Sequence, residues 1–372
     1  MSFAALCLLP ALIAGQSSAQ QEAVQKRLSE IFAGANVPGI SACVIMPDGT
    51  EILVAVGTAD EEGTVPMTSE HRFLSGSSGK MHFAVFAMQM MLEGKIKLDD
   101  QVRKYLGKEE WYGKFPGLRG TKLRHLMHHT SGVPEHVQSP TFVPALMNDP
   151  LGVWRPEELL SHNFGLKPHF APGKGWSYAD TNFILLTMAV EKASGKGAYE
   201  VIKETQLVPL GLTMTEPSVT RRFENLANGR YAARSPFGQG WSLVDGQLKL
   251  NPQFEWAGGG FVSSPRDLAR FTHDLLTGNV LPMSAVEEMT VGVPARTGRN
   301  HEYGLGLMIR PSALGRSYGH AGYMPGYITD VQHFPNHGIT ASFQMNTDDA
   351  RALGMNYQSV VVELAKAALT SS

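Results

Sequence analysis

The alternation of apolar and polar residues predicts a helix and then a β-hairpin near the start of the chain. In QQEAVQKRLSEIFAGA, apolar residues recur at helical spacing and predict an amphipathic helix. The next segment, GISACVIMPDGTEILVAVGTAD, holds two β-rich runs on either side of Pro47-Asp48-Gly49, a turn sequence. The apolar positions of the helix are Val24, Leu28, Ile31 and Phe32.

Helical patterns dominate the middle of the chain, from about residue 99 to 253, with loops rich in Gly, Pro and aromatic residues between them. Just before it, the run from Met81 to Leu92 is apolar on nearly every face, which predicts a buried central helix that stops at Gly94. LRHLMHHTSGVP predicts a short helix ending at Ser131-Gly132. DTNFILLTMAVEKASG predicts a helix capped near Asp180 or Thr181.

The C-terminal part changes character and reads mainly as strands. GGGFVSS predicts a strand, PRDLARFTHDLLTG a helix, and SVVVELAKAAL a closing helix. Between the last two, consecutive strands are indicated by YGLGLMIRP, SYGHAGY, GYITDVQHFP and GITASFQMN. Strands so far apart in sequence usually meet in one sheet with helices over it. We therefore expect an α+β fold: one antiparallel sheet flanked by helices and built from both ends of the chain, plus a mainly helical subdomain.

This pattern sets approximate boundaries. The α/β part is expected at about 20–80 and 254–372, and the helical part at about 81–253, within a single domain over 20–372. A chain of 372 residues can bury a large core. The formal net charge of −2, without long runs of one sign, gives no support for a nucleic-acid partner.

The first residues, MSFAALCLLPALIAGQSSAQQEA, resemble a signal peptide over 1–19. Phe3 to Gly15 is an apolar core, and Ser17 and Ala19 are small residues where a cleavage site needs them, although no Lys or Arg precedes the core. The alternatives are a misassigned start codon and a buried helix. Removal would take Cys7 and leave Cys43 without an intrachain partner. The expectation is a secreted or periplasmic protein with no membrane span after removal of the signal.

The most informative short motif is Ser77-x-x-Lys80 in FLSGSSGKMHFAVF. At a helix start these two side chains share a face, so the Lys80 amine can reach the Ser77 hydroxyl. An amine desolvated beside an apolar helix is a usable base, and free N–H groups at the helix N-terminus suit an oxyanion. The alternative is an ordinary serine cap followed by an ordinary lysine.

Other motifs are weaker. GRSYG, with Ser317, matches a nucleophile elbow, but the glycines and Pro325 that follow cannot start the required helix. His125 and His129 have a spacing that can suit zinc, but the accompanying Glu is missing, so bracing of a loop by His129 is favoured. The three glycines at 258–260 belong to no nucleotide-binding pattern and indicate close backbone packing. Tyr178 is either a core residue or a proton relay.

Taken together and in this order, the segments resemble the serine hydrolases that include class C β-lactamases, penicillin-binding D-alanyl-D-alanine carboxypeptidases and related esterases. The matches are SGSSGK for Ser-x-x-Lys, YAD at the Tyr-x-Asn position and HAG at the Lys/His-x-Gly position. Supporting segments are LRHLMHHTSGVP, WSYADTNFILL, GGGFVSSPRDLARF, YGLGL and GHAGYMPGY. The resemblance covers nearly the whole chain after residue 19 and implies the β-lactamase/transpeptidase-like fold, with the active site between its two parts.

The resemblance also implies residue roles. Ser77 is the acylated nucleophile, Lys80 its hydrogen-bonded partner, and Tyr178 the group that shuttles protons to the leaving group and activates the deacylating water. The backbone N–H groups of Ser77 and Tyr323 form the oxyanion hole, and His320 lines the strand edge where substrate lies. No cofactor and no metal are implied.

Two positions depart from the family pattern. Asp180 stands where Asn is usual, and an ionised carboxylate cannot donate a hydrogen bond to a substrate carbonyl. It is free instead to hold Lys80 as an ammonium or to attract a substrate amine. His320, which opens the triplet closed by Gly322, replaces the Lys of class C β-lactamases and looks like carboxypeptidase and esterase members. Both changes weaken the case for β-lactam hydrolysis but not for acyl transfer.

The sequence therefore predicts a serine hydrolase that acts through an acyl-enzyme on D-alanyl peptides or small esters. The enzyme alternative is a class C-like β-lactamase, and the alternative of another class is a non-catalytic homologue that binds peptidoglycan or a partner. The partner predicted for the hydrolase is a small-molecule or peptide acyl substrate. The natural acyl donor, the deacylation rate and the oligomeric state stay open.

Overall fold

A computed structural model of the chain describes the backbone of residues 8–370 and the side chains from residue 19 onward. Its main sheet has eight antiparallel strands in the order β2-β1-β13-β12-β11-β10-β9-β8. They are β1 Gly39–Ile45, β2 Glu51–Gly57, β8 Val293–Pro294, β9 Glu302–Tyr303, β10 Met308–Ser312, β11 Gly315–Met324, β12 Tyr327–Phe334 and β13 Ile339–Met345. Because β1 pairs with β13, the predicted sheet built from both ends of the chain is confirmed.

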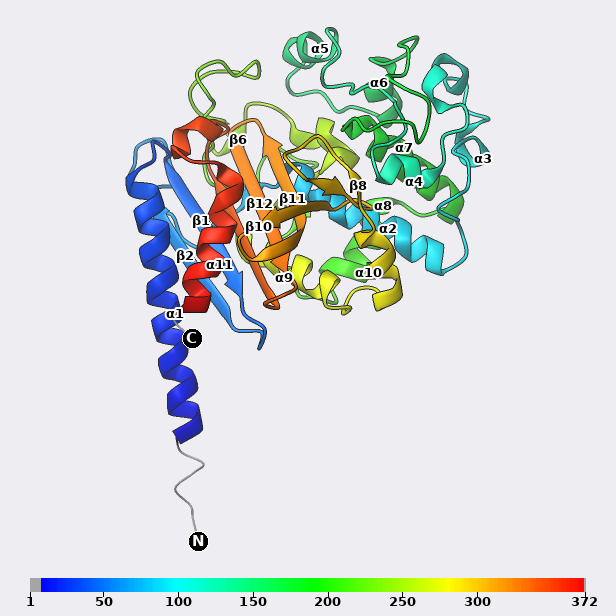
Figure 1. The fold of residues 1–372 in the computed structure, drawn as a ribbon. Coiled ribbons are helices and arrows are strands. Elements are labelled where there is room, and N and C mark those ends of the chain that lie inside the picture. The colour runs from blue at the N-terminus through cyan, green and yellow to red at the C-terminus, as the bar shows by residue number, and fades with distance from the viewer. Residues whose placement is uncertain (1–7, 371–372) are drawn as a thin grey trace.

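Helices cover both faces of this sheet (Figure 1). The helix α1 packs beside α11 and against β2, and α11 also contacts β13, whereas α9 lies across β1, β12 and β13 on the opposite face. The bounds are α1 Leu8–Ala33, α2 Lys80–Leu92, α3 Arg103–Leu106, α4 Leu123–Met127, α5 Phe142–Asn148, α6 Pro156–Ser161, α7 Asp180–Ser194, α8 Ala198–Ile202, α9 Pro265–Leu276, α10 Met283–Thr290 and α11 Val360–Thr370.

The N-terminal hairpin forms where the pattern predicted it. All residues of β1 are buried, as expected for a strand inside the sheet. In the first half of β2, which lies at the sheet edge, buried and partly exposed residues alternate. The turn between them is stabilised by the Asp48 carboxylate, which accepts a 2.9 Å hydrogen bond from the Thr50 N–H. Gly49 has φ 85°, a left-handed conformation that glycine adopts without a steric penalty.

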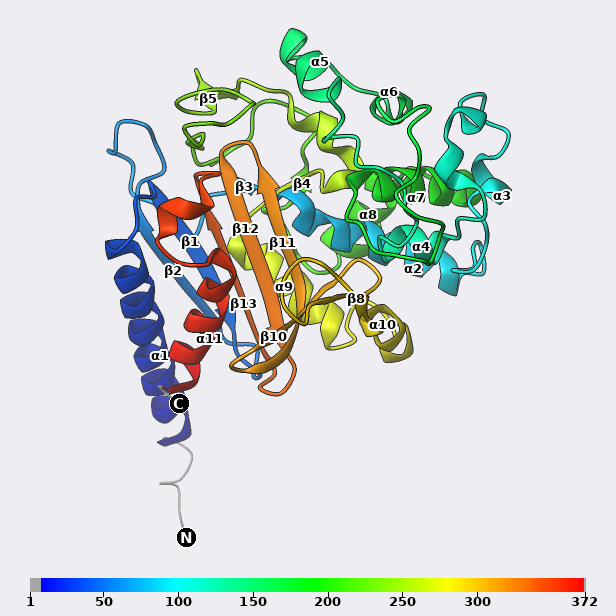
Figure 2. The same cartoon turned by 45° about the horizontal axis from the view of Figure 1, so that its top comes forward.

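The helical part lies beside the sheet and is organised around α2 (Figure 2). This helix is buried over nearly all its length, as its apolar sequence predicted, and packs against α7 and α8. Two smaller sheets are present. The first combines strands from both parts, β3 Phe73–Leu74, β7 Phe261–Ser263 and β4 Glu216–Pro217, and the second is formed by β5 Leu243–Val244 and β6 Gln247–Leu248. Short helical turns complete the chain: η1 Gly76–Gly79, η2 Tyr112–Lys114, η3 Pro116–Leu118, η4 Lys203–Leu207, η5 Pro252–Gly258, η6 Ala350–Leu353 and η7 Tyr357–Ser359.

One predicted helix end was wrong, and one predicted cap is absent. The helix α7 starts at Asp180, as the sequence predicted, but its N-cap is Ala179 and no side chain caps it, because the Asp180 side chain contacts another partner described below. The helix α4 ends at Met127, several residues before the predicted Ser131-Gly132, and His129 then takes a left-handed φ of 59° that breaks the helical path.

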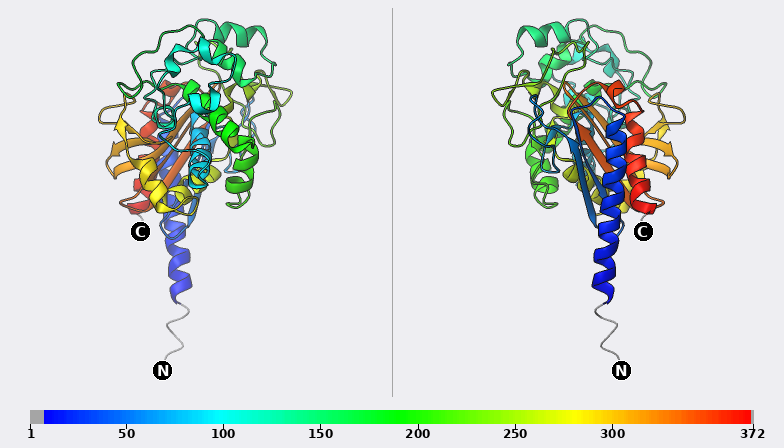
Figure 3. Two further views of the ribbon diagram at one scale, coloured as in Figure 1. Left: turned by 90° about the vertical axis from the view of Figure 1, so that its right-hand side faces the viewer. Right: turned by 90° about the vertical axis from the view of Figure 1, so that its left-hand side faces the viewer.

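The first helix is longer than the amphipathic pattern indicated. It begins at Leu8, and its N-terminal portion extends past the rest of the molecule (Figure 3). Most of the predicted signal segment, 1–19, is outside what the structure describes. Residues 1–7 are not described at all, and for residues 8–18 only the backbone is described. Within the residues that the structure describes, no helix has both the length and the apolar character needed to cross a bilayer.

Candidate active site

Ser77 lies in the turn η1, which links the small sheet to α2. Ser75 anchors the start of this turn, since its N–H and its hydroxyl both donate to the Phe261 carbonyl, at 2.9 and 2.7 Å. Gly76 then adopts φ 55°, a conformation favourable to glycine, and the chain enters the helix at Lys80. As a result Ser77 stays partly exposed while Lys80 is fully buried beneath it.

The Lys80 amine is surrounded by oxygen atoms. Its Nζ lies 3.0 Å from Ser77 Oγ, as the spacing predicted, and it also donates to Asp180 Oδ1 and to the Gly258 carbonyl. An ammonium has three protons, and these three acceptors use all of them. The Tyr178 ring centroid lies 5.0 Å from the same nitrogen, a cation–π distance. Lys80 therefore holds Ser77 through a charged hydrogen bond and is itself held by a carboxylate.

The Gly258 carbonyl reaches Lys80 because the glycine-rich loop packs directly on η1. A Cβ added to Gly79 would lie 1.7 Å from the Gly259 carbonyl oxygen, so neither segment has room for a side chain there. The loop is also strained, since Trp256 adopts φ 38° and ψ −120°, where non-glycine residues are rarely found. The predicted close backbone packing at 258–260 is confirmed.

Tyr178 is positioned by His129. The ring of His129 lies 4.2 Å from the tyrosine ring, its Nδ1 accepts a 3.2 Å hydrogen bond from the Ala179 N–H, and its carbonyl accepts from the Ser177 N–H at 3.0 Å. The prediction that His129 braces a loop is confirmed. At His125, Nδ1 accepts from the Lys122 N–H, so this nitrogen too serves the backbone.

The phenol of Tyr178 is protonated in this setting. Burial raises its pKa well above 10, the carboxylate of Asp180 raises it further, and the interaction with the Ser77 hydroxyl works in the opposite direction. The Tyr178 hydroxyl makes no hydrogen bond with the described residues, although it shares the cavity wall with Ser77. A neutral phenol has one proton to donate and lone pairs to accept another. It is therefore equipped to pass a proton along rather than to act as a standing base.

Two carboxyl groups, Asp180 and Glu255, interact with Lys80, and a third, Glu135, contacts Asp180; the sequence singled out only Asp180. Glu135 accepts a hydrogen bond from the Asp180 N–H and lies 3.1 Å from His136 Nδ1. Glu255 accepts from the Gly260 N–H at 3.0 Å. Burial raises the pKa of Asp180, with Lys80 opposing, and raises the pKa of Glu255 to about 8. Glu255 is thus largely protonated at neutral pH, and Asp180 is the carboxylate paired with Lys80.

The strand β11 approaches the nucleophile from the other side. A Cβ on Gly322 would lie 1.9 Å from the Ser75 carbonyl oxygen, and a Cβ on Gly76 would lie 2.5 Å from the Tyr323 amide nitrogen. The pairing of β10 with β11 ends at Gly319, so the following residues of β11 have no β10 residue paired with them. The backbone of Tyr323 therefore packs against η1, and Tyr323 and Ser77 both line the cavity at this strand edge.

His320 differs from its expectation. Its side chain is fully buried; Nε2 lies 2.8 Å from the Tyr303 hydroxyl, and Nδ1 lies 2.5 Å from the Ala321 carbonyl oxygen. Burial and the nearby Lys80 charge hold its pKa well below 6.5, so the ring is neutral. Its ring centroid lies 6.2 Å from that of Tyr178, and His320 is not among the residues that line the Ser77 cavity.

The Asp180 carboxylate contacts Lys80, and the side chain of Asp180 is 20% exposed. Of the two uses that the sequence left open, holding Lys80 is the one the structure supports. Ser317, in turn, lies inside β11 and donates to the Arg310 carbonyl at 3.3 Å, so no helix follows it and it has no nucleophile-elbow geometry.

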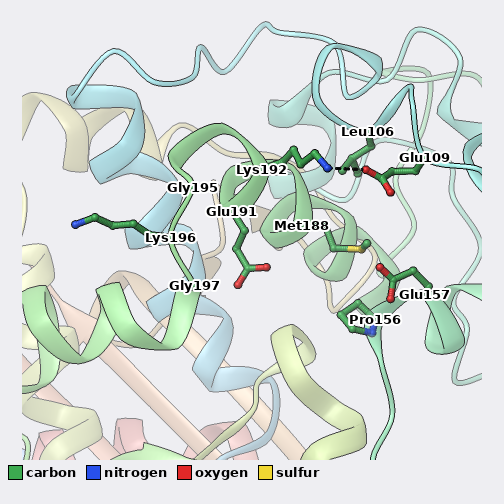
Figure 4. A pocket seen from close by; sticks show the side chains of 10 residues that line it. All are labelled: Leu106, Glu109, Pro156, Glu157, Met188, Glu191, Lys192, Gly195, Lys196 and Gly197. Carbon is green, nitrogen blue, oxygen red and sulfur yellow. Dashed lines mark hydrogen bonds and ion pairs between the residues drawn. The ribbon is translucent and has the colours of Figure 1, made fainter.

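A cavity of about 310 Å³ opens over Ser77 and contains it in its wall. Larger spaces occur elsewhere, such as the one of about 480 Å³ beside α7 in Figure 4. That space is lined by Glu109, Glu157 and Glu191, with Lys192 paired to Glu109 at 3.0 Å, and it shares no lining residue with the Ser77 cavity. Its acidic wall contains no nucleophile–base pair, so volume alone does not identify the site.

Several residues of the site carried no signal of their own in the sequence. Glu135 follows directly after the quoted segment LRHLMHHTSGVP, and Glu255 precedes the glycine cluster, but a lone Glu in a loop is usually solvated. Tyr303 lies at the edge of another quoted segment. Asp348 and Tyr357, which line the Ser77 cavity, come from the end of the chain and matched no motif.

Comparison with known proteins agrees with this arrangement. Residues 24–362 match the sequence profile described as Beta-lactamase. Penicillin-binding protein 4* of Bacillus subtilis is 26% identical over 320 residues, which covers 82% of this chain and 68% of that protein. A D-aminopeptidase of Brucella anthropi is 28% identical over 320 residues, covering 83% of this chain and 56% of that protein. The chain thus spans about two thirds or less of the length of these curated relatives.

Solved structures show the same architecture. A D-stereospecific amidohydrolase from Streptomyces superposes with a TM-score of 0.76 at 28% identity, over 90% of this chain and 96% of that one. A D-amino acid amidase from Ochrobactrum anthropi superposes with a TM-score of 0.78 at 22% identity, over 95% and 98% of the two chains. The second likeness is one of fold.

Proposed function

The chain belongs to the beta-lactamase family, whose relatives include serine hydrolases such as D-aminopeptidases and amidases, and we propose that it hydrolyses small esters and D-aminoacyl amides through an acyl-enzyme at Ser77. The observation that carries the proposal is the contact of 3.0 Å between Lys80 Nζ and Ser77 Oγ at the wall of an open cavity. A serine that merely caps a helix would not need a buried ammonium on its hydroxyl.

Ser77 Oγ would attack the carbonyl carbon while the oxygen of that carbonyl takes up negative charge. The N–H groups of Ser77 and Tyr323 are the donors proposed to receive this charge. The positive charge of Lys80, held in place by Asp180, stabilises the serine oxygen as it loses its proton. In this arrangement Lys80 acts mainly through its charge, because its protons already have three acceptors.

Tyr178 would move the proton. Its neutral phenol takes the Ser77 proton as it gives its own to the departing alkoxide or amine, so that the bond to the leaving group breaks without a free charge. Deacylation runs the same path in reverse: a water attacks the acyl carbon, Tyr178 takes its proton, and Ser77 regains one. The product acid leaves, and the site returns to its first state.

Two other functions are less well supported. A class C-like β-lactamase needs an amide donor toward the acyl side chain, and Asp180 is engaged with Lys80 instead. A non-catalytic binding protein has no need for the buried Lys80–Asp180 pair, which costs desolvation energy.

The test is intact-mass spectrometry after exposure to p-nitrophenyl acetate, D-alaninamide, a D-alanyl-D-alanine peptide and a penicillin. We expect the acyl mass on the wild type, mapped to Ser77, and none on Ser77→Ala. Ser317→Ala is the matched control and should label as the wild type does. An acyl adduct on Ser77→Ala would refute the assignment, and a folded wild type that neither labels nor hydrolyses any of the four would favour the binding protein.

Export is proposed separately. The apolar core before Ser17 and Ala19 supports a cleaved signal over residues 1–19. Mass spectrometry of the protein recovered from a periplasmic extract would give the N-terminal residue, and a retained Met1 would contradict cleavage.

A further inference from the structure

The cavity over Ser77 has an unusual charge balance. Its wall includes one carboxylate, that of Asp348, and no Lys, Arg or His among the residues that line it. The lining residues are Ser77, Tyr178, Thr297, Met308, Ala321, Gly322, Tyr323, Ile328, Asp348, Ala350 and Tyr357. The lining residues themselves thus carry one negative charge, while the positive charge of Lys80 lies buried beneath Ser77 and is paired with Asp180.

Asp348 is held rigidly as a carboxylate. Only 6% of the residue is exposed; its Oδ2 accepts hydrogen bonds from the Gly326 N–H at 3.1 Å and from the Tyr323 hydroxyl at 3.2 Å, and its Oδ1 accepts from the Ala232 N–H. All three partners are neutral donors, which orient the group without cancelling its charge. Burial raises the pKa of Asp348 and these hydrogen bonds oppose that shift, and the group is fixed in direction at the cavity wall.

Tyrosine rings form much of the remaining wall. Tyr178, Tyr323 and Tyr357 all line the cavity, and Tyr323 is 47% exposed, so aromatic surface faces the space beside the carboxylate. Aromatic faces attract ammonium groups through their quadrupole, and they do so most strongly where water is excluded. A carboxylate combined with aromatic walls is the set of groups that recognises an organic cation.

We propose that this cavity selects substrates that carry an ammonium group and rejects those that carry a carboxylate in the same place. The proposal rests on the hydrolase function given above and defines its substrate class. It separates the candidates: penicillins and peptides ending in D-alanine present a carboxylate, whereas amino-acid amides and amino esters present an ammonium. We expect about a tenfold preference for a cation over its neutral isostere, and a further tenfold against the anion, which corresponds to about 1.4 kcal/mol at each step.

The charge effect is tested with two matched ester series. In one, the leaving group is choline, 3,3-dimethylbutanol or 4-hydroxybutyrate, each as the acetate; in the other, the acyl group is 4-aminobutyrate, pentanoate or glutarate, each as a methyl ester. We expect kcat/KM to follow cation, neutral, anion in at least one series. Asp348→Asn should flatten that order, whereas Asp349→Asn, the same change in charge at the next residue and outside the cavity wall, should preserve it.

A second measurement is independent of turnover. Choline and 3,3-dimethylbutanol are titrated into the Ser77→Ala protein, with and without Asp348→Asn, after circular dichroism has shown that each variant is folded. Tighter binding of choline that depends on Asp348 supports the proposal even if no ester is hydrolysed, in which case the hydrolase function alone fails. Equal binding of both compounds, or ester rates that follow no charge order in either series, overturns it. If Asp348→Asn does not fold, Tyr357→Leu removes an aromatic wall and should lower the choline preference.

Discussion

Glu255 offers a prediction whose size follows from the structure. This buried carboxyl, 7% exposed, has a pKa of about 8 in the folded protein against an ordinary value of 4.5, mainly because burial disfavours its charge. Between these two pH values the folded state keeps a proton that the unfolded state has released. The free energy of unfolding must therefore fall as pH rises from 4.5 to about 8. Below pH 4.5 Glu255 is protonated in both states, and its burial causes no loss of stability.

Glu255→Gln removes this pH dependence. Glutamine mimics the protonated carboxyl, since its amide oxygen can accept the hydrogen bond from the Gly260 N–H as the acid does at 3.0 Å. At pH 5 wild type and variant should be nearly equally stable. At pH 8.5 the variant should gain about 3–4 kcal/mol relative to the wild type, from the linkage relation. For a chain of 372 residues this is a rise in Tm of roughly 4–5 °C.

The assay is thermal unfolding of both proteins at one scan rate, at pH 5 and pH 8.5. The control is Glu93→Gln, an exposed glutamate directly after α2, whose difference from the wild type should be the same at both pH values. If Glu255→Gln also shows a constant difference, Glu255 is ionised in the folded protein, and the statement that it is largely protonated at neutral pH is wrong.

Three further outcomes are expected around the nucleophile. Lys80→Ala and Tyr178→Phe should each lower kcat/KM for p-nitrophenyl acetate by roughly 10²–10⁴-fold, and the double variant should be little worse than the poorer single one, because the two groups act on one proton transfer; multiplicative losses would show separate roles. Asp180→Asn should lower kcat/KM roughly tenfold for this ester and equally for a penicillin, because the charged contact to Lys80 is lost. A rise in the ratio of penicillin to ester kcat/KM would mean that residue 180 faces the acyl group instead. Gly322→Ala should cost roughly 10²-fold in kcat or more, because its Cβ would lie 1.9 Å from the Ser75 carbonyl oxygen, just before η1, and would push Tyr323 away from Ser77. Gly113→Ala, with no atom within 4 Å of the added Cβ, should behave as wild type in the same ester assay.

Local patterns predicted the elements well where one periodicity dominates. The hairpin of β1 and β2 and the buried helix α2 depend on neighbours in sequence, so their residues specify them directly. Helix ends were predicted less well, as at α4, because the break at His129 serves a contact with Ala179 that lies 50 residues away.

The site divides in the same way. Ser77 and Lys80 are three residues apart on one turn, so their contact at 3.0 Å was predictable from helical geometry alone. The direction of the Asp180 carboxylate, toward Lys80 rather than toward a ligand, depends on how α7 docks against α2, which no local pattern encodes. The same holds for His320, whose burial follows from the packing of Tyr303 over β11.

By itself, the sequence determined the elements, the α+β fold class and the pairing of a serine with a lysine at a helix start, because each rests on spacing along a few turns or strands. Only the tertiary structure decided the electrostatics. Asp180 and Glu255 meet at one ammonium, Glu135 contacts Asp180, and Asp348 reaches the wall of the Ser77 cavity, from positions spread over more than half the chain. Charge interactions act through space over a few ångströms, so they become readable only once folding has brought these groups together.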